Sequence, residues 1–319
     1  MSHGYAAHHA AHKRLSTLGA GAFFLFVTAL GWALNWPAMK ILLREWPPLF
    51  SRGVAGVTAS IILAIVAALC GERLRVPWSL MPRIMLASCT NVLAWMGLST
   101  LSMKWLSVSE GALLVYTMPI WSMLLAWPVL GRRPSRMSLL AIVLGMSGLV
   151  VLLGGRGLAF DAGKLEGIAC ALGAAVLFAF GTVNSRDPLP VPPIALVAWQ
   201  VGLGCVPLVL AGIVLEHPSF ASLKPDGMAV MVYMTLVPMG VCYLTWFATL
   251  RKLPADVAAT GMLLVPIMGI VAAACALGEP LGASEAVAMM LTLGGVAVAL
   301  RCGTAARHAH QGHRSNRRV

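Results

Sequence analysis

Long apolar runs recur along the whole sequence, and they constrain the fold more than any other feature. Two examples are "LSTLGAGAFFLFVTALGWAL", from Leu15, and "MSLLAIVLGMSGLVVLLGG", from Met137. A run of roughly 20 apolar residues is long enough to cross a bilayer as a helix. A barrel strand would alternate apolar and polar residues, and these runs do not alternate. The sequence therefore predicts an all-α polytopic membrane protein.

Ten transmembrane helices are expected, separated by short polar or proline-containing segments. They fall at 18–41, 48–70, 82–103, 108–130, 136–154, 165–184, 193–215, 228–250, 256–277 and 283–301. The charged fraction of only 11% agrees with a chain that lies mostly in lipid. The first span is too long for a signal-peptide core, and no small-residue cleavage site follows it. Residues 1–17 and the basic segment 302–319 are expected to form tails outside the membrane.

The basic residues are distributed unevenly between the two sides of the predicted membrane. With the N-terminus inside, only seven of the 23 basic residues lie outside, namely Lys40, Arg44, Arg52, Lys104, Arg156, Lys164 and Lys224. This bias follows the positive-inside rule, so the net charge of +12 is interpreted as a topology signal rather than as a nucleic-acid surface. Both termini are expected in the cytoplasm, and a bacterial inner membrane is the expected location.

An internal repeat divides the predicted spans into two halves. The stretch "WLSVSEGALLVYTMPIWSMLLAWPVLGRRPS", from Trp105, resembles "KLPADVAATGMLLVPIMGIVAAACALGEPLG", from Lys252. The alignment pairs Pro119 with Pro266 and Gly148 with Gly295. Residues 18–154 and 155–301 are thus two five-helix repeats, and they are inverted in the membrane because five is an odd number. Transporters use such halves to expose one central site to each side in turn, although a duplication can also be purely structural.

Two stretches resemble the signatures of a known transporter family. The first, "GWALNWPAMKILLREWPPLFSRGVAG" from Gly31, has Trp32, Asn35, a Pro-Pro pair at 47–48 and Arg52. The second, "YLTWFATLRKLPADVAATGMLLVPIMGIVAAACALGEPLG" from Tyr243, contains Pro266 and ends in Gly-Glu-Pro-Leu-Gly. Together they resemble the EamA-type transporters of the drug/metabolite transporter superfamily, over residues 18–301.

The resemblance implies ten helices, cytoplasmic termini and export of small metabolites. The richness in Trp and Met and the lack of embedded charge are most similar to the aromatic amino-acid exporters of the YddG type. One departure is that Gly131 is followed by Arg132, where the family often has an acid.

Polar and aromatic residues at helical spacing are the candidate substrate-binding residues. These are Trp32, Asn35, Asn91, Trp95, Tyr116, Tyr243 and Trp246. Amides facing lipid are costly, so they should face the bundle interior. There they would hydrogen-bond a zwitterion while aromatic walls take its apolar part or its ammonium group. The alternative for Asn35 and Asn91 is that they only join helices to one another.

Prolines and charges in the spans receive separate interpretations. Pro119 and Pro266 are proposed hinges for alternating access, with a fixed kink as the alternative. Arg52 is expected to contact lipid headgroups, with a substrate carboxylate as the alternative.

Trp46, Trp78, Trp105 and Trp127 lie near span ends and are typical of an interfacial aromatic belt. A proton relay usually needs an acid or histidine deep in the membrane, and the predicted spans contain none.

Other functional classes find less support. "GMSG", from Gly145, resembles a rhomboid-type serine motif, but no predicted span contains a histidine base. A non-transporting receptor stays open, as do carriers of sugar phosphates, purines or drugs. No enzyme activity, cofactor or metal site is expected, since the seven cysteines are scattered singly as small packing residues and the histidines lie in the tails and one loop. The expected partners are a small-molecule substrate, an amino acid foremost, and the lipid bilayer, with no nucleic acid.

Overall fold

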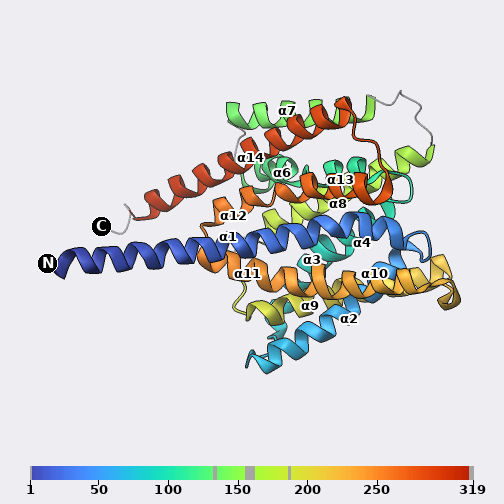
Figure 1. The fold of residues 1–319 in the computed structure, drawn as a ribbon, viewed down its shortest axis with the longest axis horizontal. Helices are drawn as coiled ribbons and strands as arrows, with labels where there is room; N and C mark the ends of the chain where they lie inside the picture. Colours follow the sequence, from blue (N-terminus) through green and yellow to red (C-terminus); the bar gives the residue numbers. More distant parts are fainter. Residues whose placement is uncertain (1, 132–134, 155–161, 186–187, 316–319) are drawn as a thin grey trace.

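The computed structural model describes residues 2–131, 135–154, 162–185 and 188–315, and the regular structure in these ranges is helical (Figure 1). Nine described helical segments are long and apolar enough to cross a membrane. The expected fifth span is present as a helix, with an apolar stretch over Arg136–Leu152 that is shorter than the others. The prediction of an all-helical, membrane-spanning chain is confirmed, while the count of ten spans stays a prediction.

The helices follow the expected spans closely, and several spans consist of more than one segment. In chain order they are α1 (Ser2–Leu42), α2 (Pro48–Leu69), η1 (Trp78–Leu80), α3 (Met81–Ala87), η2 (Ser88–Ala94), α4 (Trp95–Ser102), α5 (Val108–Val115), α6 (Met118–Leu130), α7 (Arg136–Gly154), α8 (Ala162–Asn184), α9 (Pro193–Glu216), η3 (Phe220–Ser222), α10 (Pro225–Leu236), η4 (Val237–Val241), α11 (Cys242–Lys252), α12 (Ala255–Gly261), α13 (Leu264–Leu277) and α14 (Ala283–Ser315). The first helix, α1, and the last, α14, extend beyond the expected spans into the expected tails.

Interruptions occur at matching places in the two halves of the chain. The third and eighth predicted spans each contain a π-helical segment, η2 and η4. The fourth and ninth spans are each broken into two helices, α5–α6 and α12–α13, just before Pro119 and Pro266. A proline has no N–H to donate and its ring crowds the preceding turn, so a helix readily breaks or bends there.

Turn chemistry fixes the ends of these helices. Gly131 and Gly278, which lie 147 residues apart, both adopt the left-handed conformation, with φ of 68° and 69°. Only glycine takes that conformation without strain, so α6 and α13 end at these residues. The start of α5 has a capping box, in which Ser107 and Glu110 each accept a hydrogen bond from the other's backbone N–H.

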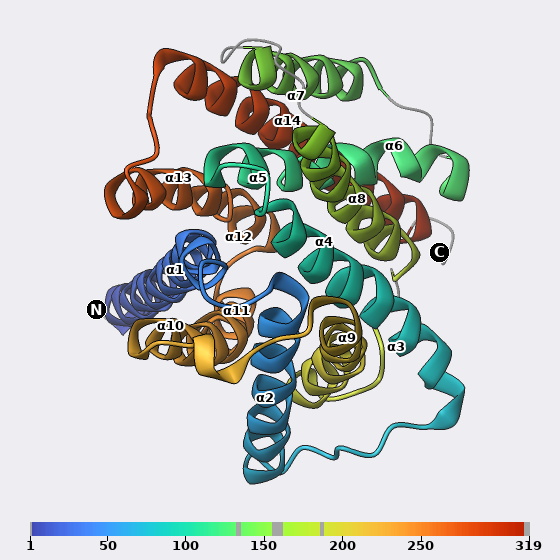
Figure 2. The ribbon, with the colours of Figure 1, turned by 90° about the vertical axis from the view of Figure 1, so that its right-hand side faces the viewer.

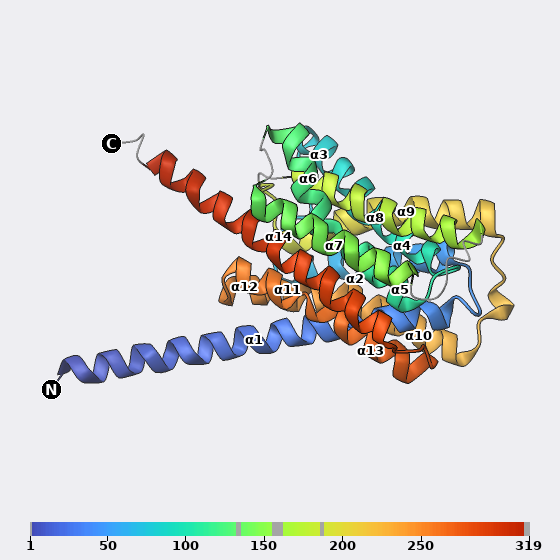
Figure 3. The same cartoon turned by 90° about the horizontal axis from the view of Figure 1, so that it is seen from above.

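The helices pack in pairs drawn from opposite halves of the chain. Figure 2 shows α2 beside α9 near one edge of the bundle and α7 beside α14 near the other. Between them, α1 packs against α11 and α13, and α8 packs against α4 and α6. Both termini lie at the same end of the bundle (Figures 1 and 3). The loop after α1 therefore lies at the opposite end.

Small residues allow the closest of these helix contacts. A Cβ built on Gly148 would lie 2.7 Å from the backbone nitrogen of Thr292, and one on Gly295 would lie 2.7 Å from the carbonyl oxygen of Ala141. A Cβ on Gly56 would collide with the Cys205 sulfur. These three glycines are therefore packing residues, because small side chains let membrane helices approach closely.

Two expectations about individual side chains need correction. Of the described cysteines, Cys205 and Cys242 are buried packing residues as expected, but Cys70, Cys89 and Cys275 lie on the exterior. Trp78 and Trp127 are 85% and 53% exposed, as an interfacial belt requires, but Trp46 is buried and is not part of such a belt. Its indole N–H donates to the carbonyl of Ser219 in the loop after α9.

Candidate functional site

An aromatic cluster forms where α1 meets α11. The Trp32 ring lies edge-on to Tyr243, with centroids 5.7 Å apart, and 6.2 Å from the ring of Trp246. The Trp32 indole N–H donates to the carbonyl of Pro238 at 2.8 Å. Pro238 lies in the π-helical segment η4, where regular backbone pairing is disturbed, so its carbonyl is available to a side chain. The structure thus brings three of the predicted residues together.

A buried polar pair lies next to this cluster. The Arg52 guanidinium, on α2, donates to the side-chain oxygen of Asn35, on α1, at 3.3 Å. Arg52 is 3% exposed and Asn35 is 6% exposed. The expectation that Arg52 contacts lipid headgroups is therefore wrong. The helix turns so that Arg52 faces the bundle, where Tyr243 and Cys205 lie within electrostatic range of its charge.

The predicted residues of the third span face α8. Trp95 lies against Phe178 of α8, with ring centroids 5.9 Å apart. The side-chain oxygen of Asn91 accepts from the Thr90 hydroxyl, and a Cβ on Gly181 of α8 would collide with that oxygen. The surroundings of Asn91 are those of a residue that joins helices. Trp95 differs, because its buried indole N–H has no hydrogen-bond partner.

Tyr116 occupies the break between α5 and α6. It is 8% exposed, and its ring lies 6.2 Å from that of Trp36 on α1. Trp36 and Tyr116 belong to the same buried cluster, against which Trp32 and Trp95 also pack. Tyr116 therefore reaches the aromatic cluster through Trp36 rather than by direct contact. Pro119 and Pro266 each lie within the first turn of the helix that follows a break.

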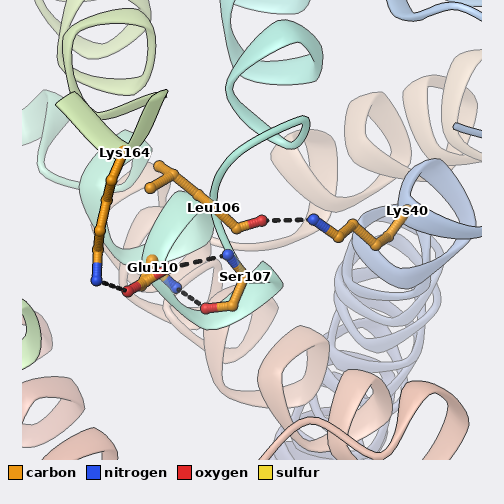
Figure 4. Close-up of polar contacts among 5 residues, drawn as sticks. All are labelled: Lys40, Leu106, Ser107, Glu110 and Lys164. Carbon is orange, nitrogen blue, oxygen red and sulfur yellow. Dashed lines mark hydrogen bonds and ion pairs between the residues drawn. The ribbon is translucent and has the colours of Figure 1, made fainter. Parts of the chain in front are cut away.

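A polar network ties several helix ends together at the end of the bundle opposite the termini (Figure 4). The Lys40 ammonium, at the end of α1, donates to the carbonyls of Met103 and Leu106 at 2.6 Å each. Glu110 completes the capping box of α5 and also forms an ion pair with Lys164 on α8, at 3.0 Å. The network joins α1, α5 and α8.

The same end of the bundle carries an open cavity of about 790 Å³, which we call the mouth cavity. It is lined by the ends of α1, α4, α9 and α13 and by the start of α2, including Lys40, Pro48, Glu216 and Glu279. Two of its acids cap helices, because Glu216 accepts from the N–H groups of Leu49 and Phe50, and Glu279 accepts from the start of α5. Its carboxylates are thus engaged by backbone donors.

Three features around the candidate substrate-binding residues were not predicted from the sequence. It placed Arg52 at the lipid surface, although the single charge one turn into an otherwise apolar helix was a signal for an inward-facing role. It did not foresee the Pro238 carbonyl or Phe178 as partners of Trp32 and Trp95. Neither has a sequence signal, since an apolar residue or a backbone group gains its role only from the helix packed against it.

A multi-pass bundle of apolar helices, with polar and aromatic side chains gathered inside it, defines an integral membrane protein of the transporter class. Residues 19–154 and 165–301 each match the EamA-like transporter family, and the chain belongs to that family. The two matched segments correspond to the two halves defined by the sequence repeat.

Relatives of the chain are also described as transporters. It is 26% identical over 275 residues to the uncharacterized transporter YvbV of Bacillus subtilis, covering 85% of this chain and 88% of that protein. It is 24% identical over 288 residues to a probable amino-acid metabolite efflux pump of Salmonella typhimurium, covering 86% and 92%. A solved crystal structure, 21% identical, superimposes with a TM-score of 0.64 over 88% of this chain and 96% of that one, which indicates a shared fold.

Proposed function

We propose that this protein exports small zwitterionic metabolites, aromatic amino acids foremost, by alternating access around a central site. The aromatic cluster of Trp32, Tyr243 and Trp246 beside the Asn35 amide carries the proposal. Aromatic faces take an apolar side chain or an ammonium group, and an amide orients the polar end of a zwitterion. The relative named as an amino-acid metabolite efflux pump supports the same substrate class.

Alternating access requires two halves that can exchange conformations, and we infer that the ten spans form two inverted five-helix repeats, 18–154 and 155–301. The π segments, the broken helices and the glycine caps recur at equivalent positions in the two halves. The packing partners of α1 also correspond to those of α8. These recurrences support a pseudo-two-fold axis in the membrane plane. Pro119 and Pro266 are the proposed hinges, because each follows a break in its helix.

The proposed location is a bacterial inner membrane, with both termini in the cytoplasm. The excess of Lys and Arg on the terminal side supports this orientation. In this orientation the mouth cavity is the outer opening of the proposed transport path. Lys40 and Lys164 then belong to an outer network that closes this opening in one state.

Two other classes remain as alternatives. Carriers of purines, sugar phosphates or drugs share the superfamily, but a phosphate calls for several deep cations. A receptor that transports nothing would bind without flux. An intramembrane serine enzyme built on the Gly145–Gly148 motif lacks support, because Gly145 and Gly148 are occupied in the contact between α7 and α14.

The test is uptake of labelled tryptophan, phenylalanine, methionine, threonine and a sugar phosphate into proteoliposomes, with and without a pH gradient. Saturable flux of the aromatic amino acids, reduced in Trp32→Ala, is the expected result. Trp78→Ala, at an exposed ring far from the cluster, is the matched control and should transport normally. Absence of amino-acid flux would refute the proposed substrate class.

A further inference from the structure

The Arg52 side chain is a buried cation whose hydrogen-bonding capacity is mostly unused. One terminal nitrogen reaches Asn35 at a long 3.3 Å, and the buried Nε atom has no partner. Among the described residues, no carboxylate lies within ion-pair distance of it. A guanidinium stays charged under all ordinary conditions, and burying an unpaired charge is strongly unfavourable. The described part of the chain therefore supplies no counter-charge for Arg52.

Four helices surround Arg52, and the described residues on them place no free carboxylate beside it. Arg52 comes from α2, Asn35 from α1, and the neighbouring Tyr243 and Cys205 come from α11 and α9. The Glu216 carboxylate, which caps α2 one turn earlier, is engaged by the N–H groups of Leu49 and Phe50. The start of α2 thus keeps an uncompensated positive charge inside a four-helix junction.

This junction lies directly below the mouth cavity. Pro48 and Lys40 line that cavity, and Arg52 and Asn35 lie four and five residues further along α2 and α1. At 1.5 Å per residue, the pair is about 6–8 Å deeper along the helix axes. Arg52 and Asn35 therefore lie about one to one and a half helical turns below the lining of the mouth cavity.

We propose that Arg52 is the carboxylate-binding residue of the transport path, with Asn35 as the residue that positions its guanidinium. The unpaired Nε and a terminal N–H present the planar fork that a carboxylate matches with two parallel hydrogen bonds. The aromatic cluster beside Tyr243 then receives the other end of the same solute. The inference rests on the proposed function and narrows its substrate class. A substrate must carry a carboxylate, and it need not carry an amine.

The primary test compares ligands on the wild-type protein, so that it does not depend on a variant folding. Thermal unfolding of the detergent-solubilised protein is measured with phenylalanine, phenylacetate and phenylethylamine. Phenylalanine and phenylacetate should raise the unfolding temperature in a saturable way, and phenylethylamine, which lacks the carboxylate, should not. Equal stabilisation by phenylethylamine, or stabilisation by none of the three, would overturn the proposal.

Variants separate a binding role from a structural one. Arg52→Gln should weaken the effect of phenylacetate about tenfold to a hundredfold, and Arg52→Lys should recover part of it. The ligand-free Arg52→Gln protein should unfold at the same or a higher temperature, since an unpaired buried charge has been removed. Arg73→Gln, which removes an exposed cation outside the mouth cavity, is the matched control and should bind normally. A lower unfolding temperature with unchanged binding would mark Arg52 as structural only.

The failure of this inference can be told apart from the failure of the proposed function. Carboxylate-dependent stabilisation without flux in proteoliposomes would refute export while leaving the carboxylate site standing. Amino-acid flux that is unchanged in Arg52→Gln would leave export standing and refute the carboxylate site.

Discussion

The Glu279 carboxylate, just beyond α13, accepts hydrogen bonds from the backbone N–H of Val108, at 2.9 and 3.0 Å, and so caps α5 from the other half of the chain. The first N–H groups of a helix have no partner within the helix, and its positive end favours an anion. This contact adds to the capping box that α5 forms with Ser107 and Glu110. It fastens the two halves together at the mouth end.

Removing this cap should destabilise the bundle. Glu279→Ala leaves the N–H groups at the start of α5 without their acceptor, at a cost of about 1 kcal/mol. We expect a decrease of roughly 2–4 °C in the unfolding temperature of the solubilised protein. Glu166→Ala, at an exposed acid on α8, is the matched control. Equal unfolding temperatures for the two variants would show that the cap contributes no stability.

The contact between α7 and α14 can be tested with two adjacent glycines. A Cβ on Gly295 would lie 2.7 Å from backbone atoms of both Ala141 and Gly145, whereas a Cβ on Gly294 meets nothing within 4 Å. Backbone cannot move aside as a flexible side chain does, so Gly295→Ala should destabilise the protein by about 1–3 kcal/mol. Gly294→Ala should be neutral or slightly stabilising, since alanine favours a helix. Thermal unfolding of the two variants makes the comparison, and a larger loss in Gly294→Ala would contradict this packing.

The Trp95 indole N–H is a second buried donor without a hydrogen-bond partner. Trp95→Phe keeps an aromatic ring against Phe178 and removes only that donor. We expect unchanged or higher thermal stability together with a several-fold increase in the KM for transport, because a substrate hydrogen bond is lost. Trp127→Phe, at an exposed ring, is the control. A loss of stability with unchanged KM would assign Trp95 to packing alone.

The sequence alone predicted the helical class, the positions of the spans and the break-prone prolines, because apolar length and proline chemistry are local properties. It also predicted one substrate-binding set, and of its seven residues Trp32, Tyr243 and Trp246 are in contact in the structure. That this set binds a substrate stays a prediction. The sequence could not orient Arg52, because the direction of a charge near a helix end depends on the helices packed around it.

The hinge assignment makes a prediction about rates. Pro119→Ala and Pro266→Ala restore a backbone N–H in the first turn after each break and remove the ring that prevents a continuous helix. If the breaks serve the conformational exchange, each change should lower the maximal transport rate several-fold while ligand affinity stays the same. Pro128→Ala, at an exposed proline within α6, is the control. Normal rates in the double variant would identify the breaks as fixed kinks.

The number of spans and the side on which the termini lie can be tested together. An even number of spans returns the C-terminus to the side of the N-terminus, and in the structure both termini lie at one end of the bundle. A full-length chain with a C-terminal green fluorescent protein should therefore fluoresce, because this reporter matures in the cytoplasm. A C-terminal alkaline phosphatase should be inactive, and the same enzyme inserted into the loop between α9 and α10 should be active. If α7 did not span the membrane, nine spans would place the termini on opposite sides, and an N-terminal and a C-terminal reporter would give opposite results.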